Sequence, residues 1–175
     1  MKLVNLFGAP CAGKTVTAAK LFAGLKSKNI NAEPVGEVAK ELIVLGNEIQ
    51  LINQVYILGC QYRKLKDLER IGTQVAISDS PLLLQLIYCK DKPYYNEIAP
   101  LILKLNSEFD NINVYMSRST PYQTFGRVHT EEEATKIDKE ILDSIGSEFD
   151  YKITAKQKKV IEFLEDEIIK KLTNT

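Results

Sequence analysis

An eight-residue segment near the N-terminus has the residue types and spacing of a phosphate-binding loop. It runs through Gly8, Ala9, Pro10, Cys11, Ala12, Gly13, Lys14 and Thr15, and it matches the pattern G-x-x-x-x-G-K-[ST]. Glycines let the backbone curl until successive N–H groups point inward at phosphate oxygens. Lys14 would neutralise the β- and γ-phosphates, and the Thr15 hydroxyl would bind Mg²⁺. We therefore expect a nucleotide site here; the alternative is a glycine turn with a solvent-exposed lysine.

Two carboxylates follow expected strands, at positions that suit phosphoryl transfer. Asp79 comes after a short apolar run and would hold Mg²⁺, directly or through water; alternatively it caps the helix that begins near Pro81. Glu37 ends the second expected strand, and a carboxylate there would take up the proton of an acceptor hydroxyl. The alternative for Glu37 is to stabilise the first turn of the next helix, and Glu33 competes with it for the role of base.

A loop that continues to about residue 129 carries the side chains expected to close over the transferring group. Arg118 and Arg127 would neutralise its equatorial oxygens, with surface salt bridges as the alternative. His129, the only histidine, would contact phosphate or base, or lie exposed at the end of the loop.

The expected helix over 48–70 carries candidates for base recognition. Its amides Asn53, Gln54 and Gln61 lie among apolar residues with tyrosines nearby, so they would read a nucleobase edge or face solvent. Its basic side chains, by contrast, have the pattern of a solvated face: Lys64, Lys66 and Arg70.

Short apolar runs alternate along the chain with helical patterns, and these elements must position the candidate residues. Strands are expected at 2–7, 30–35, 74–78, 113–117 and, more weakly, 151–155. Helices are expected at 14–27, 37–45, 48–70, 81–88, 95–109 with a break near Pro100, 131–145 and 160–172. Thr130 and Glu133 have the spacing of a capping box before the sixth of these helices.

This alternation predicts an α/β fold, with a mostly parallel sheet covered on both faces. Ligands in such folds bind beyond the carboxyl ends of the strands. The loop over 8–15, Glu37 and Asp79 all follow expected strands, so we expect them to converge on one cleft.

Length and charge indicate how many domains the chain forms and which partners it would bind. The chain has 175 residues, which suit one domain over 1–175. Its 23 Lys and Arg balance 23 Asp and Glu, which argues against an extended basic face for nucleic acid while allowing a local phosphate pocket.

The cysteines and the apolar runs indicate where the protein works. Cys11, Cys60 and Cys89 are widely spaced, as free thiols in a reducing cytoplasm would be. Cys11 lies near Lys14 and a helix N-terminus, surroundings that would make a thiol sensitive to oxidation; the alternative is that the loop needs only a small side chain at this position. Apolar runs fall short of a membrane span and of a signal peptide, so we expect a cytoplasmic protein that does not act at a membrane.

Four segments together resemble the small P-loop kinases, and among them the AAA-like ATP-binding domain also found in ribosylnicotinamide kinases. They are GAPCAGKT over 8–15, VGEVAKEL over 35–42, ISDSPLLL over 77–84 and YMSRSTPYQTFGRVHTEEEATKID over 115–138. Similar stand-alone chains are common in bacteriophage genomes. The resemblance implies the three-layer P-loop NTPase fold, with a five-stranded parallel sheet of order 2-3-1-4-5 and a lid over about 118–130.

The resemblance also implies ATP with Mg²⁺ as the phosphoryl donor. By analogy with deoxynucleoside and polynucleotide kinases, the general base falls on Glu37, and the acid ending the third strand falls on Asp79. Those deoxynucleoside kinases have Glu-Arg-Ser after the third strand, where this chain has Asp79-Ser80-Pro81, so their substrate is not carried over.

The sequence as a whole predicts an ATP-dependent kinase. The acceptor would be a hydroxyl of a nucleoside, nucleotide or related metabolite, or of a hydroxymethylated base in a short stretch of DNA. The alternative from another class is a regulatory nucleotide-binding ATPase that has no small-molecule acceptor.

Overall fold

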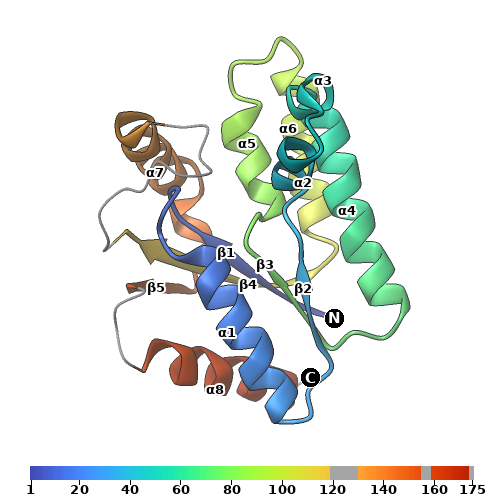
Figure 1. Cartoon of the computed structure of the whole chain (residues 1–175), viewed down its shortest axis with the longest axis vertical. Coiled ribbons are helices and arrows are strands. Elements are labelled where there is room, and N and C mark those ends of the chain that lie inside the picture. Colours follow the sequence, from blue (N-terminus) through green and yellow to red (C-terminus); the bar gives the residue numbers. More distant parts are fainter. Residues whose placement is uncertain (119–129, 155–158, 174–175) are drawn as a thin grey trace.

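A five-stranded parallel sheet forms the centre of the computed structural model, which describes residues 1–118, 130–154 and 159–173. The strands are β1 (Lys2–Phe7), β2 (Ala32–Val35), β3 (Val75–Ser78), β4 (Asp110–Ser117) and β5 (Tyr151–Thr154). They lie in the order β2-β3-β1-β4-β5 (Figure 1), and every neighbouring pair is parallel. The predicted strand order is therefore confirmed.

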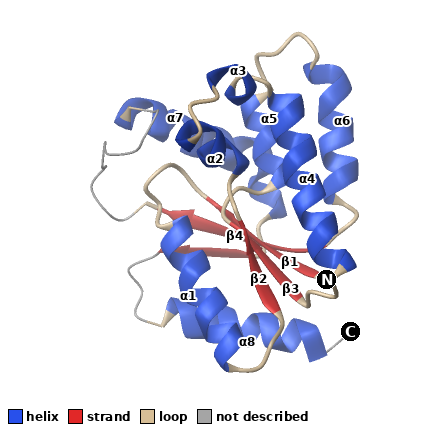
Figure 2. Cartoon of the chain, turned by 45° about the vertical axis from the view of Figure 1, so that its right-hand side comes forward, coloured by secondary structure: helices blue, strands red, loops and turns tan. Residues whose placement is uncertain are grey.

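Helices cover both faces of this sheet. They are α1 (Lys14–Ser27), α2 (Val38–Val44), α3 (Glu48–Leu51), α4 (Gln54–Arg70), α5 (Gln85–Tyr88), α6 (Tyr95–Asn106), α7 (Glu131–Ile145) and α8 (Val160–Thr173), with short 3₁₀ turns η1 (Leu82–Leu84) and η2 (Gly146–Glu148). Figures 1 and 2 show α1 and α8 on one side of the sheet and α4 to α7 on the other. The result is a three-layer α/β arrangement.

Alternation along β1 explains the two apolar layers. Leu3 and Phe7 pack into the core beneath α4 to α7, whereas Val4 and Leu6 pack into the core beneath α1 and α8. All four side chains are completely buried. Successive residues of a strand point to opposite faces, so a central strand covered on both sides has to be apolar at nearly every position.

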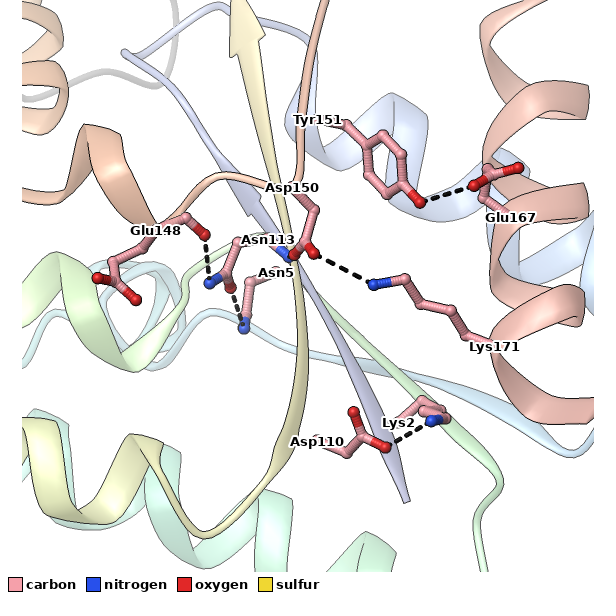
Figure 3. Close-up of polar contacts among 9 residues, drawn as sticks. All are labelled: Lys2, Asn5, Asp110, Asn113, Glu148, Asp150, Tyr151, Glu167 and Lys171. Atoms are coloured by element: carbon pink, nitrogen blue, oxygen red, sulfur yellow. Dashed lines mark hydrogen bonds and ion pairs between the residues drawn. The ribbon is translucent and has the colours of Figure 1, made fainter. Parts of the chain in front are cut away.

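Polar side chains, of which Asn5 and Asn113 are buried, join the sheet to the elements around it (Figure 3). Asn5 Nδ2 of β1 donates to Asn113 Oδ1 of β4 at 2.9 Å, and Asn113 Nδ2 donates to the Glu148 carbonyl at 2.9 Å. The backbone N–H of Asn113 donates to Asp150 Oδ2 at 2.7 Å, and Asp150 pairs with Lys171 of α8. These bonds satisfy polar groups that would be costly to bury alone.

The expected helix over 48–70 is two helices, which corrects the sequence-based prediction. Asn53 interrupts it because its side chain accepts a hydrogen bond from the backbone N–H of Tyr56 and caps α4. The apolar side chains at this break are exposed, Ile52 by 70% and Val55 by 52%. The side chains of α4 that are buried are Ile57, Leu58, Gln61 and Leu65.

Other helix and strand boundaries also differ from the predicted ones, for reasons that lie in the nearby residues. Ile30 belongs to the turn after α1, where its N–H bonds to the Leu25 carbonyl, so β2 begins at Ala32. Pro100 lies inside an unbroken α6, because proline removes one backbone donor while Ile98 and Ile102 on either side of it remain packed in the core. Over 81–88 the chain forms a 3₁₀ turn and then α5.

The capping box is confirmed, with Thr130 Oγ1 accepting from the Glu133 N–H and Glu133 accepting from the Thr130 N–H. Among the residues that the structure describes, none of the helices combines the length and apolar character needed to cross a lipid bilayer.

Candidate active site

The loop between β1 and α1 is curled by residues in left-handed backbone conformations. Gly8, Cys11 and Gly13 have φ values of +138°, +68° and +88°. Gly13 immediately precedes α1, and the Ala12 N–H bonds back to the Ala9 carbonyl at 3.1 Å. Such turns point successive N–H groups to one side and make a concave site for anions. The helix N-terminus that follows adds a partial positive charge there.

Two side chains at the start of α1 face the loop and the end of β3. Lys14 Nζ donates to the Gly8 and Ala9 carbonyls at 2.7 and 3.1 Å, so the ammonium lies against the loop. Thr15 Oγ1 donates to Asp79 Oδ2 at 2.7 Å. The residue that precedes the 3₁₀ turn after β3 is Pro81, so Asp79 does not act as the helix cap that was the alternative for it.

A cavity of about 670 Å³ adjoins the hydroxyl of Thr15 and the carboxylate of Asp79. Glu37 lines the same cavity, as do Lys40 and Glu41 of α2. Its apolar wall comes from α1, β2, α2 and β3: Ala18, Ala19, Phe22, Pro34, Val35, Val44, Leu45 and Ile77. A mostly apolar cavity lined by a few polar groups is typical of a site for a small organic molecule.

Glu37 lies between β2 and α2, at the N-cap position of α2. Its side chain makes no capping hydrogen bond, but its negative charge lies at the N-terminus of α2, where the alternative role of stabilising the first turn would act. Glu33 instead pairs with Lys26 of α1 at 2.7 Å and does not line the cavity. The structure therefore separates the two candidate bases and brings only Glu37 to Asp79 and Thr15.

Helix α4 supports this end of β2. Lys64 Nζ donates to the Gly36 carbonyl at 3.2 Å and pairs with Glu41 of α2. The expected solvated face is therefore wrong for Lys64, which joins α4 to the segment that carries Glu37. No sequence spacing predicts this contact, because its partners are 28 and 23 residues away.

Tyr88 of α5 approaches Glu37 from another helix. Burial, followed by the nearby Glu37 carboxylate, raises the pKa of Tyr88 to about 12. Desolvation and a negative neighbour both disfavour the phenolate, so the hydroxyl stays protonated and can donate a hydrogen bond at neutral pH.

Of the two arginines of the expected lid, the described residues include Arg118. Arg118, directly after β4, pairs with Glu131 at 3.3 Å and contacts the Thr135 hydroxyl at 3.4 Å. Both partners lie in the first turns of α7. Arg127 and His129 lie outside the described residues.

Asp138 of α7 is a polar link that the sequence analysis missed. Its Oδ1 accepts from the Ala9 N–H of the loop at 3.1 Å, and its Oδ2 accepts from the Tyr115 hydroxyl at 2.9 Å. Burial and this carboxylate raise the pKa of Tyr115. The available signal was an acid within the apolar stripe of α7, four residues after Ala134 and three before Ile141.

The three amides expected to read a base have different surroundings. Asn53 caps α4, and Gln54 makes a long contact of 3.5 Å with the Leu51 carbonyl. Gln61 is 3% exposed and is the one amide of the three that faces the protein interior.

Comparison with known proteins identifies the family. The profile of a family described as an AAA domain matches residues 3–159, whereas no curated protein sequence matches the chain. The solved structure of NadR in complex with NR has a TM-score of 0.70 and 18% identity, covering 99% of this chain and 52% of NadR, so this chain spans about half the length of NadR.

Two shorter proteins match over nearly their whole lengths. Deoxyadenosine kinase from M. mycoides with bound dCTP has a TM-score of 0.58 and 20% identity, covering 100% of both chains. The Mycobacterium tuberculosis APS kinase CysC has a TM-score of 0.52 and 15% identity, covering 99% of this chain and 97% of that one. These structures share the P-loop NTPase fold with this chain, and the family match over most of its length shows that the chain belongs to this family of AAA domains.

Proposed function

We propose that this protein is an ATP-dependent kinase that transfers the γ-phosphoryl group to a hydroxyl of a nucleoside, nucleotide or related small metabolite. The observation that carries the proposal is the meeting of three groups at one cavity. The Thr15 hydroxyl and the Asp79 carboxylate lie 2.7 Å apart, and the Glu37 carboxylate lines the cavity that adjoins both. A donor site and a base beside one small-molecule cavity are what phosphoryl transfer requires.

The donor would bind through the loop. The curled backbone over 8–15 would hold the phosphates with its N–H groups, and Lys14 would neutralise their charge. The oxygens of Thr15 and Asp79 are the type of donor that Mg²⁺ prefers, so these two residues would hold the ion that neutralises the phosphate chain when it is bound. NadR has been solved with NAD and AMP-PNP, which supports ATP as the donor for this chain.

The acceptor would enter the cavity with its hydroxyl toward Glu37. The acceptor oxygen forms a bond to the γ-phosphorus, its proton passes to the Glu37 carboxylate, and the bond from that phosphorus to the β-phosphate oxygen breaks to release ADP. Arg118 would leave Glu131 to neutralise the transferring group, and Arg127 of the lid would assist it.

The test is an acceptor panel with labelled ATP and Mg²⁺. We expect an acceptor-dependent labelled product from nucleosides, nucleotides, nicotinamide riboside or DNA that contains a hydroxymethylated base. Lys14→Ala should lower its formation by about 100-fold or more, whereas Lys20→Ala, an exposed lysine on the same helix, should leave it unchanged. Slow phosphate release without any labelled acceptor would contradict the kinase and favour the regulatory ATPase.

The role of Glu37 is tested separately. Glu37→Gln should retain ATP affinity and lose about 10²- to 10⁴-fold in turnover, because the amide cannot accept the proton. Glu33→Gln is the matched control, since Glu33 lies in β2 four residues before Glu37 and pairs with Lys26. Full turnover in Glu37→Gln would remove Glu37 from the role of base.

A further inference from the structure

Two exposed apolar side chains form part of the wall of the cavity that Glu37 lines. Val44 is the last residue of α2 and Leu45 follows it, and both line this cavity. They are nevertheless 78% and 76% exposed. Apolar surface in water is unfavourable in proportion to its area, and exposed apolar surface bordered by polar groups is typical of ligand-binding grooves. A molecule bound in the cavity would cover both side chains.

Position, rather than exposure, distinguishes these two residues from others nearby. Ile49 of α3 is 81% exposed, but it does not line the cavity. Val44 and Leu45 belong instead to an apolar wall that also includes Phe22 of α1. The Phe22 ring packs against the buried core beneath α1 and α8, so the fold holds this part of the wall in place. An apolar part of a ligand would therefore contact side chains from both α1 and the end of α2.

The charged groups of the cavity disfavour a second anion beside the phosphoryl donor. Among the described residues that line it, Glu37, Glu41 and Asp79 are acidic, and Lys40 is basic. Lys64 of α4 pairs with Glu41, but the carboxylates still outnumber the ammonium groups. ATP with bound Mg²⁺ would add further negative charge, and like charges repel strongly where water is excluded. An acceptor without a phosphate group fits this arrangement better than a nucleotide does.

We propose that the acceptor is an unphosphorylated nucleoside, and that Val44 and Leu45 determine its specificity by contacting its ring. The two faces of a nucleobase are apolar enough to lie against such side chains, while the sugar carries the hydroxyl that Glu37 would accept a proton from. The cavity of about 670 Å³ lies within the range of about 300–1,000 Å³ that is usual for organic ligands of this size. The inference rests on the proposed function and specifies its substrate class.

The first experiment measures stability without any ligand. Val44→Ser and Leu45→Ser remove apolar surface that the fold leaves exposed, so we expect each melting temperature to stay within about 2 °C of the wild type. A large fall in both variants would overturn the proposal, because it would show that the two side chains stabilise the fold rather than await a ligand.

The second experiment measures binding by calorimetry in the presence of Mg²⁺ and a non-hydrolysable ATP analogue. The probes are a set of nucleosides, their 3′-monophosphates, and methyl riboside, which lacks the ring. We expect the wild type to bind at least one nucleoside, and to bind its 3′-monophosphate and methyl riboside at least about 10-fold more weakly.

The variants show whether the two side chains contact the ring. Val44→Ser and Leu45→Ser should each weaken nucleoside binding by roughly 5- to 50-fold, with affinity for methyl riboside and for the ATP analogue unchanged. Leu45→Met should restore nucleoside binding to within about 3-fold of the wild type, because it keeps an apolar side chain of similar volume. Ile49→Ser is the matched control and should leave every affinity unchanged, since Ile49 is equally exposed but lies outside the cavity wall.

The outcomes separate this inference from the proposed function. Nucleoside binding that depends on Val44 and Leu45, but is followed by no phosphoryl transfer when ATP replaces the analogue, would support the apolar wall and contradict the kinase. Transfer to methyl riboside or to a nucleotide as fast as to any nucleoside would support the kinase and overturn the substrate class. Failure of every nucleoside to bind, unchanged binding in both serine variants, or equal weakening in Ile49→Ser would also overturn the inference.

Discussion

The curl of the phosphate loop depends on single residues that adopt a positive φ or that have no side chain. Gly8 combines φ of +138° with a close approach, because a Cβ added there would lie 2.4 Å from the Met116 carbonyl oxygen. Cys11 has φ of +68°, a conformation that costs a residue with a Cβ about 1–2 kcal/mol. The loop therefore tolerates strain at one position and requires glycine at another.

Gly8→Ala tests that requirement. The new methyl group would force β1 and β4 apart at this point, so we expect a loss of about 2–4 kcal/mol in the free energy of unfolding and weakened nucleotide binding. Urea denaturation and calorimetry with a magnesium nucleotide measure the two effects. Gly72→Ala is the control, because Gly72 has φ of +78° but open space around it; it should cost about 1 kcal/mol and leave binding intact. Equal effects on binding would contradict the steric explanation.

At the scale of elements, Asp138 connects α7 to the phosphate loop and to β4. The carboxylate accepts from the Ala9 N–H with one oxygen and from the Tyr115 hydroxyl with the other. One side chain thus joins three elements that lie far apart in the sequence.

Two substitutions of Asp138 distinguish the effect of its hydrogen bonds from the effect of its negative charge. Asp138→Ala leaves the Ala9 N–H without its partner, so we expect a loss of about 1–3 kcal/mol in the free energy of unfolding together with weaker nucleotide binding. Asp138→Asn should retain most of both, because its amide oxygen can accept from Ala9 and its NH₂ can donate to Tyr115. Urea denaturation and nucleotide calorimetry are the measurements, and equal losses in the two variants would show that the negative charge matters instead.

Helix α4 offers a second prediction at this scale. Gly59 is exposed in the middle of the helix, and an added Cβ would meet no atom within 4 Å. Gly59→Ala should therefore raise the free energy of unfolding by about 1 kcal/mol, as measured in urea. Gly46→Ala, equally uncrowded but with φ of +65°, should lower it. An increase in both variants would contradict the dependence on backbone conformation.

At the scale of the whole molecule, two apolar layers hold the sheet between its helices, and hydrogen bonds at the edges of these layers add to them. Tyr151 at one edge donates to Glu167 Oε2 of α8 at 2.8 Å (Figure 3). Burial and then this carboxylate raise the pKa of Tyr151 to about 12. The pKa values of Tyr88 and Tyr115, on the opposite side of the sheet, are also raised.

These tyrosines predict a loss of stability in alkali. The unfolded chain ionises at the ordinary tyrosine pKa of about 10, while the folded chain keeps its protons longer, so stability falls as the pH rises through 10 toward 12. In Tyr151→Phe, the free energy of unfolding should fall less between pH 10 and 12 than in the wild type. Below pH 10, its dependence on pH should match that of the wild type. Urea denaturation at a series of pH values measures it, and identical slopes in alkali would contradict the assignment to Tyr151.

Several features were predictable from the sequence because their causes are local. The loop pattern, the capping box of Thr130 and Glu133, and the alternation of strands and helices each depend on residues a few positions apart. The same reasoning failed at Asn53 and Pro100. The Asn53 side chain caps a new helix, which ends the expected one. At Pro100 the helix continues, because Ile98 and Ile102 remain packed in the core.

The sequence by itself determined the layered α/β fold and its phosphate loop, because backbone conformation and apolar periodicity are properties of neighbouring residues. Only the tertiary structure decided that Glu37 rather than Glu33 reaches the cavity, that Lys64 supports the end of β2, and that Asp138 holds the loop. These contacts join residues between 23 and 129 positions apart. Their geometry depends on strand register and on the rotation of each helix, which are decided when all the layers pack together.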